Sequence, residues 1–457
     1  MRIAIFLTCL SFAVTNFSDA QNKDSIIFRN ISNDILSNGR AYSNLRVLCK
    51  EVGPRLSGSP QQQKAEKETA RMLKEMGADT VYLQACQVPH WVRGEKETAY
   101  FTDADGKNYP LNICALGNSV GTGKNGIKAP VVEINSFEQM DRLGEKGLKG
   151  KIVFFNINMN PTYLNTSQAY GEATPYRWLG PSKAAKYGAV ATMIRSLASN
   201  ADDYPHTGGM SYNDSFPKIP AIAVSTNDAD RFTKALQKNK DLKLFIRSTS
   251  ETLPDVTAHN VIGEIRGSEF PDEIITVGGH LDSWDLAEGA HDDGTGCVQS
   301  MELIRVYKKL GIRPKHTLRV VLFTDEENRG SGAKKYAELA KAENKKYVFA
   351  LESDDGGFTP RGFHFMVSEE KLVKILHWVP LFVPYGVYKF DRGEAGADVE
   401  YLAPLGTVLA GLDPDSQRYF DHHHSAIDKF ERVSKRELEL GAINMANLVY
   451  LADQYGF

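Results

Sequence analysis

From residue 259 onward, short apolar runs alternate with longer helical patterns. The runs at residues 274–277, 317–323 and 347–351 are largely apolar, and helical patterns at 295–309 and 332–340 separate them. A nearly continuous apolar run suits a strand buried on both faces, and successive parallel strands require a crossover connection that is usually a helix. The pattern therefore predicts an α/β fold with a mixed, largely parallel sheet flanked by helices.

The chain has 457 residues, which exceeds the usual size of a single hydrophobic core. Between residues 115 and 255, short strands lie among loops rich in Gly, Pro and Asn. We expect an inserted β-rich domain there. The predicted segments are a signal peptide at 1–20, an N-terminal part of the main domain at 21–114, the insert at 115–255 and the rest of the main domain at 256–457.

The N-terminus has the pattern of an export signal. Met1-Arg2 gives a positive start, residues 3–14 are apolar, and Ser18-Asp19-Ala20 supplies small residues before the expected cleavage. The apolar run is too short to span a bilayer, and no later run is long enough to serve as a permanent membrane anchor. A lipoprotein interpretation of Cys9 is disfavoured by Thr8. We expect a periplasmic or extracellular protein.

Composition excludes several classes of partner and site. The formal net charge is −3 and no long basic run occurs, so we expect no nucleic-acid partner. The mature chain keeps widely spaced cysteines without a CxxC pair, which argues against a zinc-finger framework. The sequence is compatible with one or two disulfides after export and does not assign their pairing. These residues are Cys49, Cys86, Cys114 and Cys297.

Acids and imidazoles follow successive strands of the predicted sheet. Because ligands bind beyond the carboxyl ends of strands in open α/β sheets, these groups are expected to meet at one edge. A glycine-bounded acidic pair, Asp292-Asp293, precedes a predicted helix, and the run His422-His423-His424 follows the strand at 407–412. The strand-end residues are His280, Asp282, Glu326, Glu327, Glu352 and Asp354.

Each of these groups has an ordinary structural explanation when taken alone. A strand-end His and Asp commonly form a hydrogen-bonded pair, and Glu326-Glu327 suits a helix N-terminus. Taken together, they match a site for two divalent ions about 3.5–4 Å apart that share one carboxylate. Imidazole and carboxylate ligands suit zinc, with manganese or cobalt as alternatives. One glutamate of the pair binds metal while the other stays free as general base.

The motifs of the predicted metal site resemble those of the M28 family of dinuclear zinc peptidases. The likeness is strongest to the carboxypeptidase Q (plasma glutamate carboxypeptidase) branch. It extends to the Gly-Pro-Arg-Leu-Ser-Gly-Ser stretch at 53–59 and to Pro-Lys-Ile-Pro-Ala at 217–221, where the insert is similar to a protease-associated domain. The motifs of the site itself are Gly-Gly-His-Leu-Asp-Ser-Trp at 278–284, Asp292-Asp293-Gly294, Glu326-Glu327, Glu352-Ser353-Asp354 and His424-Ser425.

The resemblance implies a zinc-peptidase fold, two Zn²⁺ ions and a homodimer. It also implies roles for individual residues, which we carry over by position. His424 is chosen from the histidine run because Ser425 follows it and Asp428 lies four positions on. Asp292 would bridge the two ions, His280 and Asp354 would complete one site, Glu327 and His424 would complete the other, Glu326 would be general base and acid, Asp282 would orient His280, and Asp293 would have an unusual backbone geometry.

The implied activity is hydrolysis of short peptides by an exopeptidase. The sequence does not decide whether the enzyme recognises the amino or the carboxyl end of the substrate peptide. Aminopeptidase and dipeptidase action are both compatible with the predicted site. Lys429 and the sequence of residues 392–398 differ from the pattern of the branch. The preference for particular substrate side chains therefore stays open. Residues 392–398 are expected to face substrate.

Two rivals share the expected fold: a glutaminyl cyclase, which uses a single zinc, and a non-catalytic receptor, which would have lost metal ligands. A serine hydrolase is disfavoured because no helical pattern follows the GxSxG match at 117–121. A metalloprotease of the HExxH type is excluded because the sequence contains no His-Glu pair.

Overall fold

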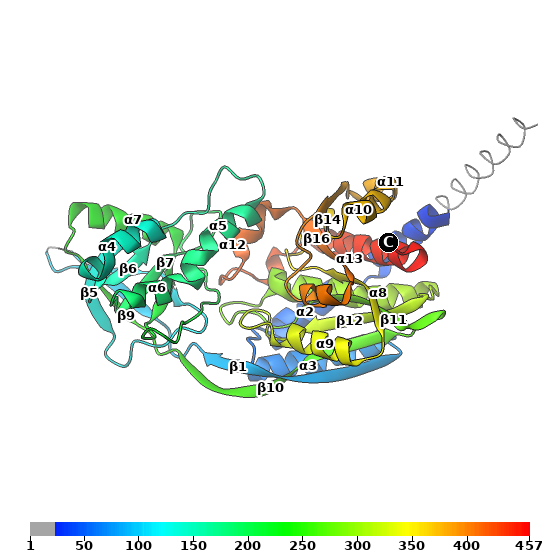
Figure 1. Cartoon of the computed structure of the whole chain (residues 1–457), viewed down its shortest axis with the longest axis horizontal. Helices are drawn as coiled ribbons and strands as arrows, with labels where there is room; N and C mark the ends of the chain where they lie inside the picture. Colours follow the sequence, from blue (N-terminus) through cyan, green and yellow to red (C-terminus); the bar gives the residue numbers. More distant parts are fainter. Residues whose placement is uncertain (1–22, 104) are drawn as a thin grey trace, which may run out of the picture.

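The computed structural model describes residues 23–103 and 105–457, and contains two sheets of eight strands each. The predicted signal peptide at 1–20 lies outside the described residues. In Figure 1 the two sheets belong to two units that lie side by side, with the second half of the sequence concentrated in one of them. Within the described part of the chain, no helix is long and apolar enough to cross a bilayer.

The first sheet is mixed, as the sequence predicts. Its central strands β12, β11, β13 and β16 are mutually parallel. β1 and β10 continue the sheet antiparallel on one side, while β14 pairs antiparallel with β16 and parallel with β15 on the other. In order across the sheet, the strands are β1 Thr80–Val92, β10 Glu251–Ile265, β12 His316–Phe323, β11 Phe270–His280, β13 Lys346–Glu352, β16 Val408–Pro414, β14 Pro360–Met366 and β15 Lys389–Arg392.

Successive side chains of the central strands enter two different cores because side chains alternate across a strand. In β12, Val320 and Leu322 pack into a core built with the helix at residues 23–38 and with α2, α3, α8 and α13. Val321 and Phe323 pack into a second core with α9 and η4 on the opposite face. These helices are α2 Ala41–Val47, α3 Pro60–Glu75, α8 Thr295–Leu310, α9 Ser331–Ala342, η4 Val399–Leu405 and α13 Lys435–Tyr455.

Shorter helical turns connect these elements. Two of them, η2 and α12, lie in loops that carry predicted site residues. The turns are η1 Leu48–Val52, η2 Ala290–Gly294, α10 Glu369–Leu376, α11 Val379–Phe382, η3 Val383–Tyr385, η5 Ser416–Arg418, α12 Tyr419–His422 and η6 Phe430–Arg432.

The second unit is itself an α/β layer and is less β-rich than expected. Its strands β5 to β8 are parallel, and helices pack against both of its cores. Across the sheet the strands are β3 Asn108–Leu111, β2 Thr98–Thr102, β9 Lys243–Arg247, β5 Ile127–Ile134, β6 Ile152–Phe155, β7 Ala191–Arg195, β8 Ala221–Val224 and β4 Ile113–Ala115. The helices are α4 Phe137–Leu148, α5 Thr166–Trp178, α6 Gly180–Lys186 and α7 Thr226–Lys238.

This second sheet begins before the boundary expected at residue 115. β2 pairs with β9, and β3 pairs with β2. Ala99, Phe101 and Leu111 are buried in the core of the second unit, together with residues of β5 to β9. Residues 98–114 therefore pack with the second unit, although sequence position alone placed them with the main domain.

The long antiparallel pair β1 and β10 runs from the first sheet toward the second unit (Figure 1). β1 precedes the second unit in the sequence and β10 follows it, so this strand pair forms both connections between the units. Four cysteines are described, and all are buried free thiols, so no disulfide joins the described residues. They are Cys49, Cys86, Cys114 and Cys297.

Candidate metal centre

The strands of the first sheet bring the predicted site residues to one edge. His280 is the last residue of β11, Glu326 and Glu327 follow β12, and Asp354 follows β13. Because these strands are parallel and adjacent, their carboxyl ends lie together. Asp292 comes from η2, directly before α8, and His424 comes from the loop after α12.

Asp292 lies at the centre of the cluster. Its Oδ1 lies 3.1 Å from His280 Nε2, and its Oδ2 lies 3.2 Å from His424 Nε2. His280 Nε2 also lies 3.1 Å from Asp354 Oδ1, and His424 Nε2 lies 3.1 Å from Glu327 Oε2. Each imidazole therefore faces two carboxylates, and the two sets have Asp292 in common.

The donor set fits divalent cations. Among the described residues, the buried Glu327 Oε1 has no hydrogen-bond partner, and the buried Asp292 Oδ2 and Asp354 Oδ1 face only imidazole nitrogens. Buried polar atoms are normally satisfied, so buried carboxylate oxygens gathered here with so few partners suit a divalent cation. With metal–ligand bonds of about 2.0–2.2 Å, two ligand atoms of one tetrahedral ion lie about 3–3.5 Å apart, the separation seen in both sets.

The cluster perturbs the ionisation of its members. Burial by itself would lower the pKa values of His280 and His424, but the adjacent carboxylates outweigh it and raise both pKa values well above the usual range. Burial would also raise the pKa of Asp292, yet hydrogen bonds with the two imidazoles hold it well below its usual range. The described side chains thus concentrate negative charge where a cation would be stabilised.

The adjacent glutamates differ in their contacts. The carboxylate of Glu327 is engaged with His424, whereas the carboxylate of Glu326 has no hydrogen-bond or ion-pair partner among the described residues. Glu326 is half-buried, and its backbone N–H donates to Asp282 Oδ1 at 3.2 Å. Burial, together with the charges of Asp354 and Glu327, raises the pKa of Glu326 well above its usual range.

Asp282 and Asp293 support the cluster by contacts that the sequence did not specify. His280 Nδ1 donates to the backbone carbonyl of Asp282 at 3.0 Å, while the carboxylate Oδ1 of Asp282 lies farther away, at 3.8 Å. The carboxylate of Asp293 accepts the backbone N–H of His280 at 3.0 Å and that of Gly296 at 2.9 Å. The peptide bond between Asp292 and Asp293 is cis.

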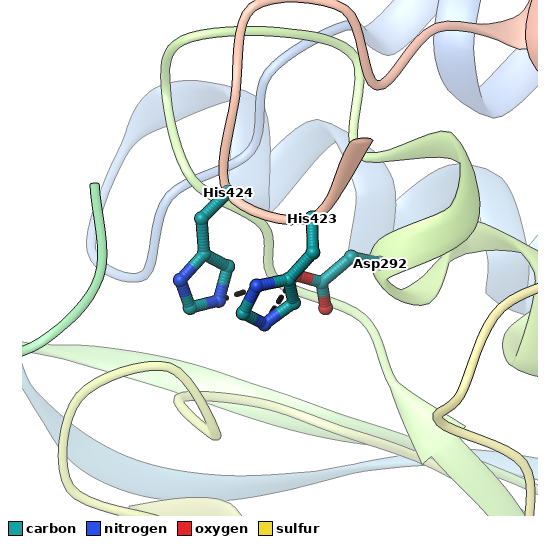
Figure 2. Close-up of side chains that lie close together, drawn as sticks. All are labelled: Asp292, His423 and His424. Carbon is teal, nitrogen blue, oxygen red and sulfur yellow. Dashed lines mark ion pairs between the residues drawn. The ribbon is translucent and has the colours of Figure 1, made fainter. Parts of the chain in front are cut away.

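The three consecutive histidines have different surroundings. His424 faces both Asp292 and Glu327, whereas His423 Nε2 lies 3.7 Å from Asp292 Oδ2 and stacks on the ring of His424. Figure 2 shows these two rings beside Asp292. His422 instead stacks on His291. Sequence reasoning chose His424 from its position before Ser425 and did not place His423 in the cluster.

Arg55, in the early Gly-Pro-Arg stretch, braces the loop between His280 and Asp292. Its guanidinium is fully buried and donates to the carbonyls of Leu281, Glu288 and Gly289, the last two at 2.6 and 2.9 Å. The sequence singled out this stretch only as part of the resemblance. Its structural effect depends on a contact between residues more than two hundred positions apart, which no local pattern signals.

Two cavities adjoin the cluster. One, of about 480 Å³, is lined by the five predicted metal ligands, by Glu326 and by residues of α5 in the second unit. The other, of about 540 Å³, shares Ser167, Asp354, Asp355 and Glu394 with the first and is lined by residues 392–397. The segment 392–398, which was predicted to face substrate, therefore borders a cavity beside the cluster.

Comparisons with known proteins agree with this architecture. Residues 260–449 match the profile of Peptidase family M28. Carboxypeptidase Q of Mus musculus is 36% identical over 413 residues, which cover 90% of this chain and 85% of that protein. Aminopeptidase YwaD of Bacillus subtilis (strain 168) is 26% identical over 434 residues, covering 90% of this chain and 84% of that protein.

Among solved structures, the peptidase M28 precursor from Shewanella amazonensis SB2B superposes with a TM-score of 0.91 at 30% identity. The match covers 96% of this chain and 98% of that chain, so both units of the fold are shared. The resemblance drawn from the motifs is thereby confirmed. With the parallel strands, the clustered acids and imidazoles and these relatives in agreement, the chain belongs to peptidase family M28.

Proposed function

We propose that the chain is an exported, zinc-dependent exopeptidase that hydrolyses short peptides. The observation that carries the proposal is the carboxylate of Asp292, which offers one oxygen to the surroundings of His280 and the other to those of His424. A carboxylate shared in this way suits a bridging ligand between two divalent ions. In this proposal His280, Asp354 and Asp292 hold one Zn²⁺, and Glu327, His424 and Asp292 hold the other.

Glu326 is the proposed general base and acid. Its carboxylate is free, lines the cavity beside the ligands and has a raised pKa, which suits a group that accepts a proton and later returns it. When bound, the two ions would polarise the scissile carbonyl and lower the pKa of the attacking water. Glu326 takes the proton of that water and delivers it to the leaving amine as the peptide bond breaks.

Short substrates are supported by the helix that covers the site. α5 of the second unit contributes Ser167, Tyr170 and Arg177 to the cavity over the metal cluster. A long polypeptide would have to pass this helix, whereas a short peptide fits within the two adjoining cavities. The two similar proteins are a carboxypeptidase and an aminopeptidase, so the proposal extends to exopeptidase action without fixing the end that is read. Export is proposed from the signal pattern at 1–20.

The central test replaces Glu326 by Gln, which keeps the side-chain volume and removes the proton acceptor. We expect two bound zinc ions per chain in both proteins, and a loss of about 10²–10⁴-fold in kcat in the variant. Glu370→Gln, a change at an exposed position of α10, is the matched control and should leave both quantities unchanged. Near-normal turnover of Glu326→Gln with both ions present would exclude Glu326 as the base.

A substrate panel then fixes the reaction and the peptide end. Dipeptides and tripeptides with free or blocked termini are assayed before chelation, after chelation and after zinc is restored. Loss of activity only with a blocked amino end indicates aminopeptidase action, loss only with a blocked carboxyl end indicates carboxypeptidase action, and loss with either end blocked indicates dipeptidase action. Release of ammonia from an N-terminal glutamine without peptide cleavage would instead indicate a cyclase.

A further inference from the structure

A loop of the second unit pairs directly with the loop that carries His424. The backbone N–H of Thr207 donates to the carbonyl of His424 at 2.9 Å, and a single antiparallel bridge joins His206 to Ser425. The ring Nδ1 of His206 donates to the carbonyl of His423 at 2.6 Å. His206 and Thr207 are buried at this junction, so the two loops form one packed element.

The same loop also reaches the ring of His424. His424 Nδ1 lies 3.3 Å from the carbonyl of Thr207, and a carbonyl can only accept, so Nδ1 carries the proton. This leaves Nε2, which faces Asp292 and Glu327, as the nitrogen available to a metal. We propose that the second unit positions His424 for metal binding through the Thr207 carbonyl, an inference that rests on the proposed two-metal function.

The two imidazoles of the cluster are held in different ways. His280 Nδ1 donates to the carbonyl of Asp282, two residues further along its own loop, whereas His424 Nδ1 donates to a residue of the other unit. Hydrogen-bond partners of this kind fix the orientation and tautomer of a metal-binding histidine. A disturbance of the 206–208 loop therefore affects the ion held by His424 and Glu327 and spares the ion held by His280 and Asp354.

The carbonyl of Thr207 is itself fixed by the second unit. Thr207 Oγ1 donates to the carbonyl of Ala115 at 2.8 Å, and the N–H of Gly117 donates to the carbonyl of Gly208 at 3.0 Å. Gly208 has a φ of +132°, and a Cβ there would lie 2.7 Å from His424 Nδ1 and would also meet the guanidinium of Arg177. A methyl group at this position would force the loop, the imidazole or the guanidinium to shift.

The test uses Gly208→Ala in the full chain. After saturation with zinc and exhaustive dialysis, we expect the wild type to retain two ions and the variant to retain one. Competition with a chromophoric chelator should show one dissociation constant raised by about 10–100-fold and the other unchanged, the range typical for loss of such a partner. The visible spectrum of the cobalt-substituted variant should lose the contribution of one of its two ions.

Gly123→Ala is the matched control. Gly123 belongs to the second unit and also has a positive φ, +77°, but no atom lies within 4 Å of its would-be Cβ. It carries the backbone cost of the substitution without a contact to the His424 loop, and it should retain both ions with wild-type affinity.

Thr207→Val is a milder second variant, in case Gly208→Ala does not fold. It removes the hydrogen bond to Ala115 while keeping the side-chain shape and the carbonyl, and we expect a several-fold weakening of the same ion. Wild-type affinities for both ions in the folded variants would overturn the inference. A wild-type chain that holds fewer than two ions would contradict the proposed function instead.

Discussion

The carboxylate of Asp428 accepts the backbone N–H of Asp292 at 3.2 Å. Its other oxygen accepts the N–H of His291 at 2.8 Å. Asp428 thus ties the loop after His424 to the turn that carries the central carboxylate of the cluster. Both N–H groups are buried, so the carboxylate satisfies donors that water does not reach.

Replacing Asp428 by Asn should weaken this tie. The amide keeps the size of the side chain but places an NH₂ group against one of the two N–H donors, and we expect the free energy of unfolding to fall by about 1–3 kcal/mol. Urea denaturation measures the change. Asp421→Asn, at a partly exposed position of α12, is the control. An unchanged denaturation midpoint for Asp428→Asn would show that the contact does not stabilise the fold.

Asp292→Asn should reduce metal content more than any other single substitution in the cluster. An amide oxygen is neutral and cannot bridge two cations as a carboxylate does, so both ions lose a ligand. Asp354→Asn should affect only the ion near His280, because Asp354 contacts that imidazole alone. Metal analysis after dialysis compares the two variants, and equal losses would argue against a shared role for Asp292.

Substitutions of His423 and His424 should have different effects on metal content in the same analysis. His424→Ala removes an imidazole that faces two carboxylates and should cost one ion. His423→Phe keeps an aromatic ring in the stack and should retain both ions, because His423 Nε2 lies 3.7 Å from Asp292 and contacts no second carboxylate among the described residues. Loss of an ion from His423→Phe would transfer the ligand role to His423.

Arg55→Lys should destabilise the loop between His280 and Asp292. The planar guanidinium donates to three carbonyls, and a single ammonium group cannot reach all three. We expect the free energy of unfolding to fall by about 1–3 kcal/mol for each carbonyl left without a donor, measured by urea denaturation. Arg46→Lys, at an exposed position of α2, controls for the general effect of the exchange.

Glu302 gives the chain a specific pH dependence. It shares the buried guanidinium of Arg305 with Asp34, through contacts of 2.5 and 2.6 Å, and burial raises the pKa of Glu302 from 4.5 to about 7. The folded state therefore binds more protons than the unfolded state between these values. The contribution of Glu302 to stability falls as pH rises from about 4.5 to about 7 and is constant above that.

Glu302→Gln removes this titration. Denaturation curves at about pH 5 and about pH 8 should show a smaller pH-dependent loss of stability in the variant than in the wild type. The difference between the two proteins isolates Glu302 from the acids of the candidate metal centre, which titrate in both. Parallel pH profiles for variant and wild type would assign the titration to another group.

Much of the main domain could be predicted from local patterns. The strands that contain residues 274–277, 317–323 and 347–351 were predicted from largely apolar runs, and the helices after two of them from helical spacing. The second sheet was harder to delimit. β2 pairs with β9, more than a hundred residues further along the chain, and pairing between segments distant in sequence leaves no local signature.

The sequence by itself determined which residue types arrive at the carboxyl edge of the sheet, because strand and helix periodicity fixes where each strand ends and which residues come next. Only the tertiary structure decided how Asp292 divides its oxygens between His280 and His424, that Arg55 braces the intervening loop, and that Thr207 of the second unit holds the ring of His424. These contacts join residues far apart in the chain, and their geometry depends on the packing of two units rather than on any local preference.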